Sequence, residues 1–224
     1  MPEAVYFDEG QKKAIDAILS GDPTFGIDLD SKKRKFDAFN AILGTERVLT
    51  DLKSKVPLSF RGESLMECDP SNSSEVVSAL VKLVLEMGMN PVLVLMNFTS
   101  KSVIRSLKTS GLDDKVIIID TVSKVFSHAE DSERLFFVDS PRNLTQLQIK
   151  MINIMDSKKN TCFIFDSLGI LGLYHEEGVV LKFVYSLTKL LHKRSSSGFF
   201  VSAGKTNPRL IQFFDEEVKV KKFI

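Results

Sequence analysis

Residues 64–86 read "SLMECDPSNSSEVVSALVKLVLE", and this stretch decides the fold class. It begins with a short apolar run, 64–68, and then passes through a tight polar turn. The apolar residues after the turn recur at helical spacing: Val76, Leu80, Leu83 and Val84. A buried strand followed by a turn and an amphipathic helix is the first half of a unit that brings the next strand in parallel to the first. The stretch therefore predicts an α/β protein.

The same alternation of strand and helix continues to the end of the chain. Apolar runs predict strands at 64–68, 91–96, 115–120, 135–139, 161–166 and 198–203. These runs are continuously apolar, as strands buried on both faces are. In a last run, 217–222, apolar and charged residues alternate, which predicts a strand with one solvent-exposed face near a sheet edge. We therefore expect a three-layer αβα domain with a mostly parallel sheet over residues 57–224.

Residues 1–56 have a different pattern and are expected to form an N-terminal helical extension. Apolar residues at helical spacing predict one helix near 11–20 and a second over 31–43, with Gly44 marking the end of the second. Isolated helices of this length are marginal in water. The two helices should therefore dock on the α/β body or on a second chain.

Charge and hydropathy exclude several kinds of partner. The chain has 30 basic and 29 acidic residues and a formal net charge of +1, which offers no basic surface for nucleic acid or anionic lipid. No apolar run approaches the roughly 18 residues needed to cross a bilayer. The N-terminus carries acids where a signal peptide needs bases. Cys68 and Cys162 lie in apolar runs and predict buried, reduced thiols. We expect a cytoplasmic protein that binds neither nucleic acid nor membrane.

The turn after residues 64–68 has the place of a phosphate-binding loop but not its residues. In the motif GxxxxGK[ST], glycines let backbone N–H groups face the phosphates, the lysine reaches the β- and γ-phosphates and the hydroxyl holds magnesium. Aligned on Pro70, this chain differs at each diagnostic position: Cys68 and Ser73 replace the glycines, Ser74 the lysine and Glu75 the magnesium ligand. The turn should therefore bind phosphate poorly.

The surrounding segments resemble the core of the RecA/KaiC-like ATPases. The stretch "TCFIFDS", 161–167, resembles the Walker B strand of that superfamily, which commonly ends in Asp-Ser, here Asp166 and Ser167. The stretch "VPLSFRGESLMECDP", 56–70, resembles the lead-in to the KaiC phosphate loop. The resemblance spans residues 57–221 and implies a RecA-like α/β fold.

The resemblance also implies that ATP hydrolysis has been lost. The stretch "PVLVLMN", 91–97, is similar to the strand that ends in a catalytic glutamate, and Asn97 stands at that place. The segments after residue 139 are similar to an archaeal group of RecA-superfamily proteins whose ATPase motifs are often degraded. The phosphate cation, the magnesium hydroxyl and the water-activating carboxylate are then all missing.

From this resemblance we expect a pseudo-ATPase that serves as a regulatory or scaffold protein, through a protein partner or through copies of itself. It would have no catalytic residue, no metal and no cofactor. The alternative is weak binding of ATP and magnesium, with the missing charge supplied by Lys205 or Arg209. The residues of such a vestigial nucleotide site are Asp69, Ser71, Asn72, Ser73, Ser74, Asp166 and Ser167. A lone carboxylate such as Asp166 is, however, more often a hydrogen-bond anchor than a metal ligand.

The resemblance further implies the order of the strands in the sheet. The expected order is 217–221, 64–68, 198–203, 161–166, 91–96 and 115–120. In this order Cys68 and Cys162 lie on strands that are not neighbours, so they should not form a disulfide.

Overall fold

The computed structural model describes residues 43–126 and 128–223. The helix predicted near 11–20 and all but the last residue of the one predicted over 31–43 lie outside the described residues.

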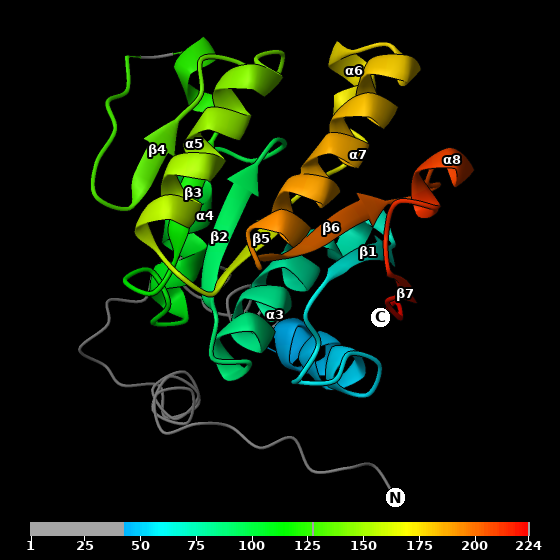
Figure 1. Cartoon of the computed structure of the whole chain (residues 1–224). Helices are drawn as coiled ribbons and strands as arrows, with labels where there is room; N and C mark the ends of the chain where they lie inside the picture. The colour runs from blue at the N-terminus through cyan, green and yellow to red at the C-terminus, as the bar shows by residue number, and fades with distance from the viewer. Residues whose placement is uncertain (1–42, 127, 224) are drawn as a thin grey trace, which may run out of the picture.

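In the described part of the chain, seven parallel strands form one sheet. Figure 1 shows how the strands are arranged. The strands are β1 (Glu63–Cys68), β2 (Asn90–Leu95), β3 (Ile117–Asp120), β4 (Leu135–Phe137), β5 (Thr161–Phe165), β6 (Ser197–Ala203) and β7 (Glu216–Lys219). Their order is β4-β3-β2-β5-β6-β1-β7, and each neighbouring pair is parallel. The predicted order is confirmed, and β4 extends it beyond β3. Cys68 and Cys162 are buried and free, on strands separated by β6.

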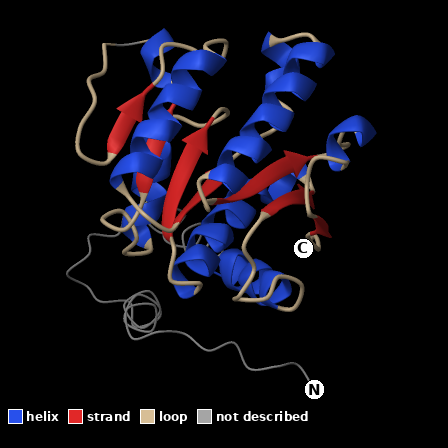
Figure 2. Cartoon of the chain, in the orientation of Figure 1, coloured by secondary structure: helices blue, strands red, loops and turns tan. Residues whose placement is uncertain are grey.

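Helices cover both faces of this sheet, which makes the expected three layers (Figure 2). On one face lie a helix over residues 43–53, α3 (Ser73–Glu86) and α4 (Ser100–Thr109). On the other face lie α5 (Leu144–Ser157) and α7 (Glu177–Lys193), with the short helices α6 (Leu171–Tyr174) and α8 (Pro208–Ile211). Two single 3-10 turns, η1 (Pro70–Asn72) and η2 (Ser123–Val125), follow β1 and β3.

The continuously apolar strands supply both cores, because successive side chains point to opposite faces. In β5, Cys162 and Ile164 pack beneath α3, whereas Phe163 and Phe165 pack beneath the α5 and α7 layer. Phe165 stacks on Phe200 of the neighbouring strand, with ring centroids 4.7 Å apart. Because both faces are buried, this sheet needs apolar residues at almost every position.

The helix over 43–53 passes through Gly44, so the predicted helix end at that glycine is wrong. A Cβ at Gly44 would lie 3.2 Å from Cγ of Glu75. The glycine therefore allows this helix to approach α3 closely and does not cap it. The helix then buries Val48, Leu49 and Leu52 in the same core as α3.

A pair of carboxyl groups joins β1 to the start of β7 at the amino end of the sheet. The backbone N–H of Glu63 donates to Oδ2 of Asp215 at 2.9 Å, and the N–H of Asp215 donates to the carbonyl of Glu63 at 2.9 Å. Burial and the hydrogen bond with Asp215 raise the pKa of Glu63 to about 7. A Cβ at Gly62 would lie 2.5 Å from Asp215 Oδ2, so only glycine fits there without a shift.

Replacing Leu52 with alanine should lower the free energy of unfolding of the whole α/β domain. Leu52 is fully buried, and truncating a buried leucine loses about 2–5 kcal/mol through lost transfer energy and a residual cavity. Urea denaturation followed by circular dichroism measures the change. Leu58→Ala is the matched control, because Leu58 is 50% exposed and should cost no more than about 0.5 kcal/mol. An unchanged midpoint for Leu52→Ala would show that the 43–53 helix lies outside the cooperative core.

Candidate functional site

Ligands of open parallel sheets bind at the carboxyl ends of the strands, where neighbouring strands send their connections to opposite faces. This sheet has two such points. β1 and β2 lead to α3 and α4 on one face, whereas β5 and β6 lead to α6 and α8 on the other. One point therefore lies between β1 and β6 and the other between β2 and β5. The predicted site residues fall into two groups, 69–74 at the first point and 166–167 at the second.

At the first point, η1 joins β1 to α3 with no open loop. Asp69 caps this turn, because its Oδ1 accepts from the N–H of Ser71 at 2.9 Å and from the Ser71 hydroxyl at 2.6 Å. Pro70 occupies the first position of the turn, where a missing N–H costs nothing. The segment that the sequence places on a phosphate loop is therefore a capped helix start.

The other polar side chains of the first group also bond within the chain. The Ser73 hydroxyl donates to the carbonyl of Pro70 at 3.1 Å, and the Ser74 hydroxyl donates to Oε2 of Glu75 at 2.8 Å. Asn72 donates from Nδ2 to the carbonyl of Lys221 at 3.2 Å, while its buried Oδ1 has no partner among the described residues. Few polar groups here are left to meet a ligand.

The pairing of β1 with β6 continues past the strand ends through a backbone hydrogen bond. The N–H of Gly204, which follows β6, donates to the carbonyl of Cys68 at 3.0 Å. Gly204 has φ +94°, a conformation that favours glycine. This bond extends the parallel pairing of β1 with β6 by one position beyond Ala203.

Two cations lie beside the turn: Lys222, whose Nζ lies 3.1 Å from Oδ2 of Asp69, and Arg47, which lines a pocket with Ser71, Asn72 and Glu75. Hydrogen bonds from Ser71 and the contact with Lys222 lower the pKa of Asp69 to about 2. Among the described residues neither Lys205 nor Arg209 forms an ion pair with Asp69, and Arg209 pairs with Glu177 at 3.4 Å. The sequence analysis missed Lys222, although the predicted pairing of β7 with β1 could have shown that residues after β7 end beside the turn.

At the second point, the buried carboxylate of Asp166 is an acceptor for the loop after β2. Its Oδ1 accepts from the N–H of Met96 at 2.7 Å, and its Oδ2 accepts from the N–H groups of Asn97 and Phe98 at 3.1 Å each. Burial raises the pKa of Asp166 to about 6, against the opposing effect of these hydrogen bonds. Asp166 therefore ties β5 to the loop after β2, and Ser167 beside it is also buried.

At the end of β3, Asp120 is likewise a buried acceptor for backbone N–H groups of neighbouring loops, and it was not among the residues predicted from the sequence. Its carboxylate accepts from the N–H of Ser100 at 2.6 Å and from the N–H groups of Val122 and Ser123 at 2.8 Å each. Burial acts to raise its pKa, but hydrogen bonds from Ser123 and Ser100 outweigh burial and lower it. The recurrence of an aspartate after an apolar run was the signal that could have found it.

A pocket of about 280 Å³ lined by several polar side chains lies at the carboxyl ends of β5 and β6. Its polar side chains bond mainly to one another: Asn207 donates to Glu177 at 2.8 Å and Thr206 to Ser202 at 2.9 Å. Lys205 also lines this pocket. Among the described residues no three His, Cys, Asp or Glu side chains are grouped to hold a metal ion.

Comparisons with known proteins add a fold likeness at low identity. No family model matches the chain, and no curated protein matches it. One similar solved structure is a KaiC-like protein from the hyperthermophilic archaeon Pyrococcus horikoshii OT3, with 12% identity and a TM-score of 0.48. The likeness covers 68% of this chain and 67% of that one. No helix in the described part of the chain is both long and apolar enough to cross a bilayer.

Replacing Asp166 with asparagine should change the pH dependence of stability. The pKa of Asp166 is about 6 in the folded state against 3.8 for an unperturbed aspartate, so the folded state holds its proton more tightly. The stability that this carboxyl contributes is full below pH 3.8 and is lost as pH rises through about 6. Relative to wild type, Asp166→Asn should gain about 3 kcal/mol of unfolding free energy from acid to neutral pH.

Denaturant titrations across this pH range measure the difference. The control is Asp139→Asn: the exposed Asp139 has its pKa lowered by hydrogen bonds from Lys124 and Gln146. That variant should show the opposite sign and lose stability relative to wild type as pH rises. A constant difference between Asp166→Asn and wild type would contradict the assigned role of burial.

Proposed function

We propose that this chain is a RecA/KaiC-type pseudo-ATPase that acts as a regulatory or scaffold protein by associating with a protein partner or with copies of itself. The observation that supports the proposal is that polar side chains at both points already bond within the chain. Asp69, Ser73 and Ser74 do so at the first point, and Asp166 accepts three backbone N–H groups at the second.

Phosphate binding at the first point would work against the charges already there. A phosphate near the start of α3 would compete with Asp69 for Lys222 and would face the carboxylate of Glu75 in the first helical turn. A charge-assisted hydrogen bond contributes on the order of 1.5 to 3 kcal/mol. Losing two such contacts moves a micromolar site into the millimolar range, since each 1.4 kcal/mol is about a tenfold change.

Exposed apolar side chains at the carboxyl edge supply a surface for association. Phe126, after β3, is 81% exposed, and Leu173 of α6, after β5, is 75% exposed. Each has an exposed apolar neighbour in the chain, Val125 at 52% and Tyr174 at 39%, and exposed large apolar groups that gather mark sites of protein interaction. The sheet edges are less suited to pairing, because β4 has only three residues and the N–H of Phe137 already donates to Asp131 at 2.8 Å.

The remaining parts of the proposal concern the compartment and the excluded partners. The balanced charge of the chain supports a protein that binds neither nucleic acid nor membrane. Cys68 and Cys162 are free and buried, and burial raises the pKa of both thiols, so they are inert. Unpaired cysteines fit a reducing compartment, and we propose the cytoplasm.

A second candidate is weak nucleotide binding, which the position of Lys222 favours. This lysine lies at the turn where the phosphate cation would be needed, although it enters from the chain after β7. A nucleotide would have to draw Lys222 away from Asp69 to use it.

Calorimetric titration with ATP and magnesium should separate these candidates. We expect no hydrolysis and a dissociation constant near or above 1 mM, a binding free energy of about −4 kcal/mol or weaker. A constant below about 10 μM that Lys222→Ala weakens tenfold would favour the nucleotide-binding candidate. The control Lys193→Ala changes a lysine on the last turn of α7 and should have no effect.

Sedimentation over a wide range of protein concentration should show association through the carboxyl edge. The double variant Phe126→Ser and Leu173→Ser should weaken association by at least about tenfold, because each change removes an exposed apolar contact. Ile149→Ser is the matched control, since Ile149 is 51% exposed on α5. Equal association of all three proteins would contradict the proposed surface.

A further inference from the structure

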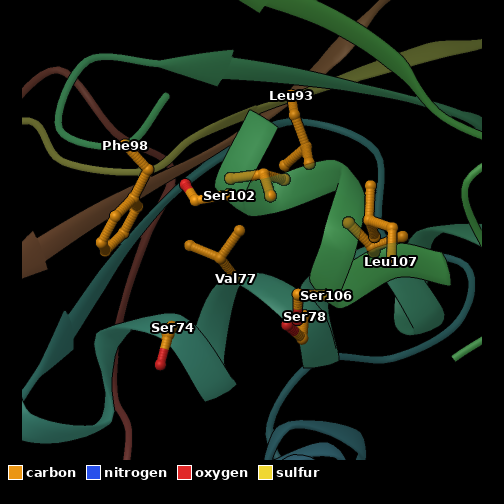
Figure 3. A pocket seen from close by; sticks show the side chains of 10 residues that line it. Ser74, Val77, Ser78, Leu93, Phe98, Ser102, Ser106 and Leu107 are labelled. Atoms are coloured by element: carbon orange, nitrogen blue, oxygen red, sulfur yellow. The ribbon is translucent and has the colours of Figure 1, made fainter. Parts of the chain in front are cut away.

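An apolar groove separates α3 from α4 and has no role in the function proposed above. Its volume is about 210 Å³. Leu93 of β2 lies at its base and Phe98 at one end, and Val77 and Leu107 stand on the two helices, as Figure 3 shows.

The rims of the groove are small and uncharged. Ser74 and Ser78 lie one turn apart on α3, and Ser102 and Ser106 lie one turn apart on α4. Spacing by four residues puts each pair on one side of its helix, and all four line the groove. Short side chains on both rims leave room for another element to lie between the helices. The lining contains no charged group, so the occupant must present apolar side chains.

We propose that residues 11–20 of the same chain dock in this groove as an amphipathic helix. The segment "QKKAIDAILS" places Ala14, Ile15, Ile18 and Leu19 at helical spacing on one side. These side chains match the apolar lining, and the serine rims admit the helix backbone. This inference goes beyond the proposed function and does not depend on it.

The beginning of the described chain lies beside the groove. A Cβ at Gly44 would lie 3.2 Å from Glu75, and Glu75 is the neighbour of the rim residue Ser74. Residues 21–42 span at most roughly 70 Å when extended, and a flexible chain of that length has a mean span of about 26 Å. The groove from Ser74 to Val81 is about 10 Å long along α3. The segment can therefore reach the groove without strain.

Charge also favours this occupant. α4 carries Lys101, Arg105 and Lys108 on its exposed side, and none of the three has an ion-pair partner among the described residues. The chain just ahead of the docking segment carries Glu3, Asp8 and Glu9. Opposite charges flanking an apolar contact orient the docked helix and raise its rate of association.

Disulfide trapping in the full chain tests the inference. Ile18→Cys is combined with Ser106→Cys on the groove or, as the matched control, with Thr50→Cys, an exposed threonine outside the groove on the helix over 43–53. The native thiols do not interfere, since Cys68 is 7% and Cys162 0% exposed. A tethered but undocked segment would reach Thr50 at least as readily as Ser106, because Thr50 lies on the helix where the tether ends, so docking should make the 18–106 disulfide form at least about tenfold faster.

The outcomes divide clearly. An intramolecular 18–106 disulfide that forms faster than the 18–50 disulfide supports the inference. Equal rates, or no 18–106 disulfide, overturn it. A disulfide that appears only between two chains overturns docking in the same chain and assigns the groove to a second copy.

A second measurement needs no cysteine. The chain contains no tryptophan, so Phe98→Trp places a single fluorophore at the end of the groove. Ile15→Asp with Ile18→Asp should shift its emission to longer wavelength by exposing the indole. Ala17→Asp, on the opposite side of the segment, should leave the emission unchanged. Identical emission from all these proteins would overturn the inference even if a disulfide variant failed to fold.

Discussion

Every strand of this sheet runs in the same direction, so all seven strands end at the same edge of the sheet. The backbone N–H groups that follow each strand lose their partners in the sheet. Buried N–H groups must find other acceptors. Aspartates at the carboxyl ends of β3 and β5 supply them: Asp120, the last residue of β3, accepts from Ser100 and Ser123, and Asp166, just after β5, accepts from residues 96–98. Asp69, just after β1, accepts in the same way from the exposed Ser71. The loops, and therefore the whole carboxyl edge, depend on these bonds.

This constraint also explains why the carboxyl edge of the sheet has few side-chain groups free to bind a ligand. Both oxygens of Asp166 accept backbone N–H groups, and Asp69 is shared between η1 and Lys222. A carboxylate that completes a loop in this way would have to give up those bonds to hold a metal ion. Two apolar features of the surface do not complete loops in this way. One is the set of exposed residues around Phe126 and Leu173, and the other is the groove between α3 and α4. Recognition by apolar contact is thus the chemistry that the described surface offers most readily.

The fold was largely predictable because its signals are local and repeated. Continuous apolar runs such as 161–166 identify strands buried on both faces, and helical spacing between them identifies the crossovers. The site was less predictable. Alignment with the phosphate-loop motif placed the turn at 69–74 in the position of a phosphate loop. In the structure Asp69, Pro70 and Ser71 begin a helical turn there. Gly44 reads in sequence as a helix end, but it lies within a helix and permits contact with Glu75.

The sequence by itself determined the α/β class and the missing glycines and lysine of the phosphate loop, since each follows from residue type and short-range spacing. The order of the strands was implied only by the resemblance to the RecA/KaiC-like ATPases. Only the tertiary structure decided which charges and acceptors meet. Lys222 reaches Asp69 across 153 positions, and Asp166 reaches the N–H of Met96 across 70. Such contacts depend on how β7 pairs with β1 and β5 with β2. That pairing results from the packing of the whole sheet, which no short segment encodes.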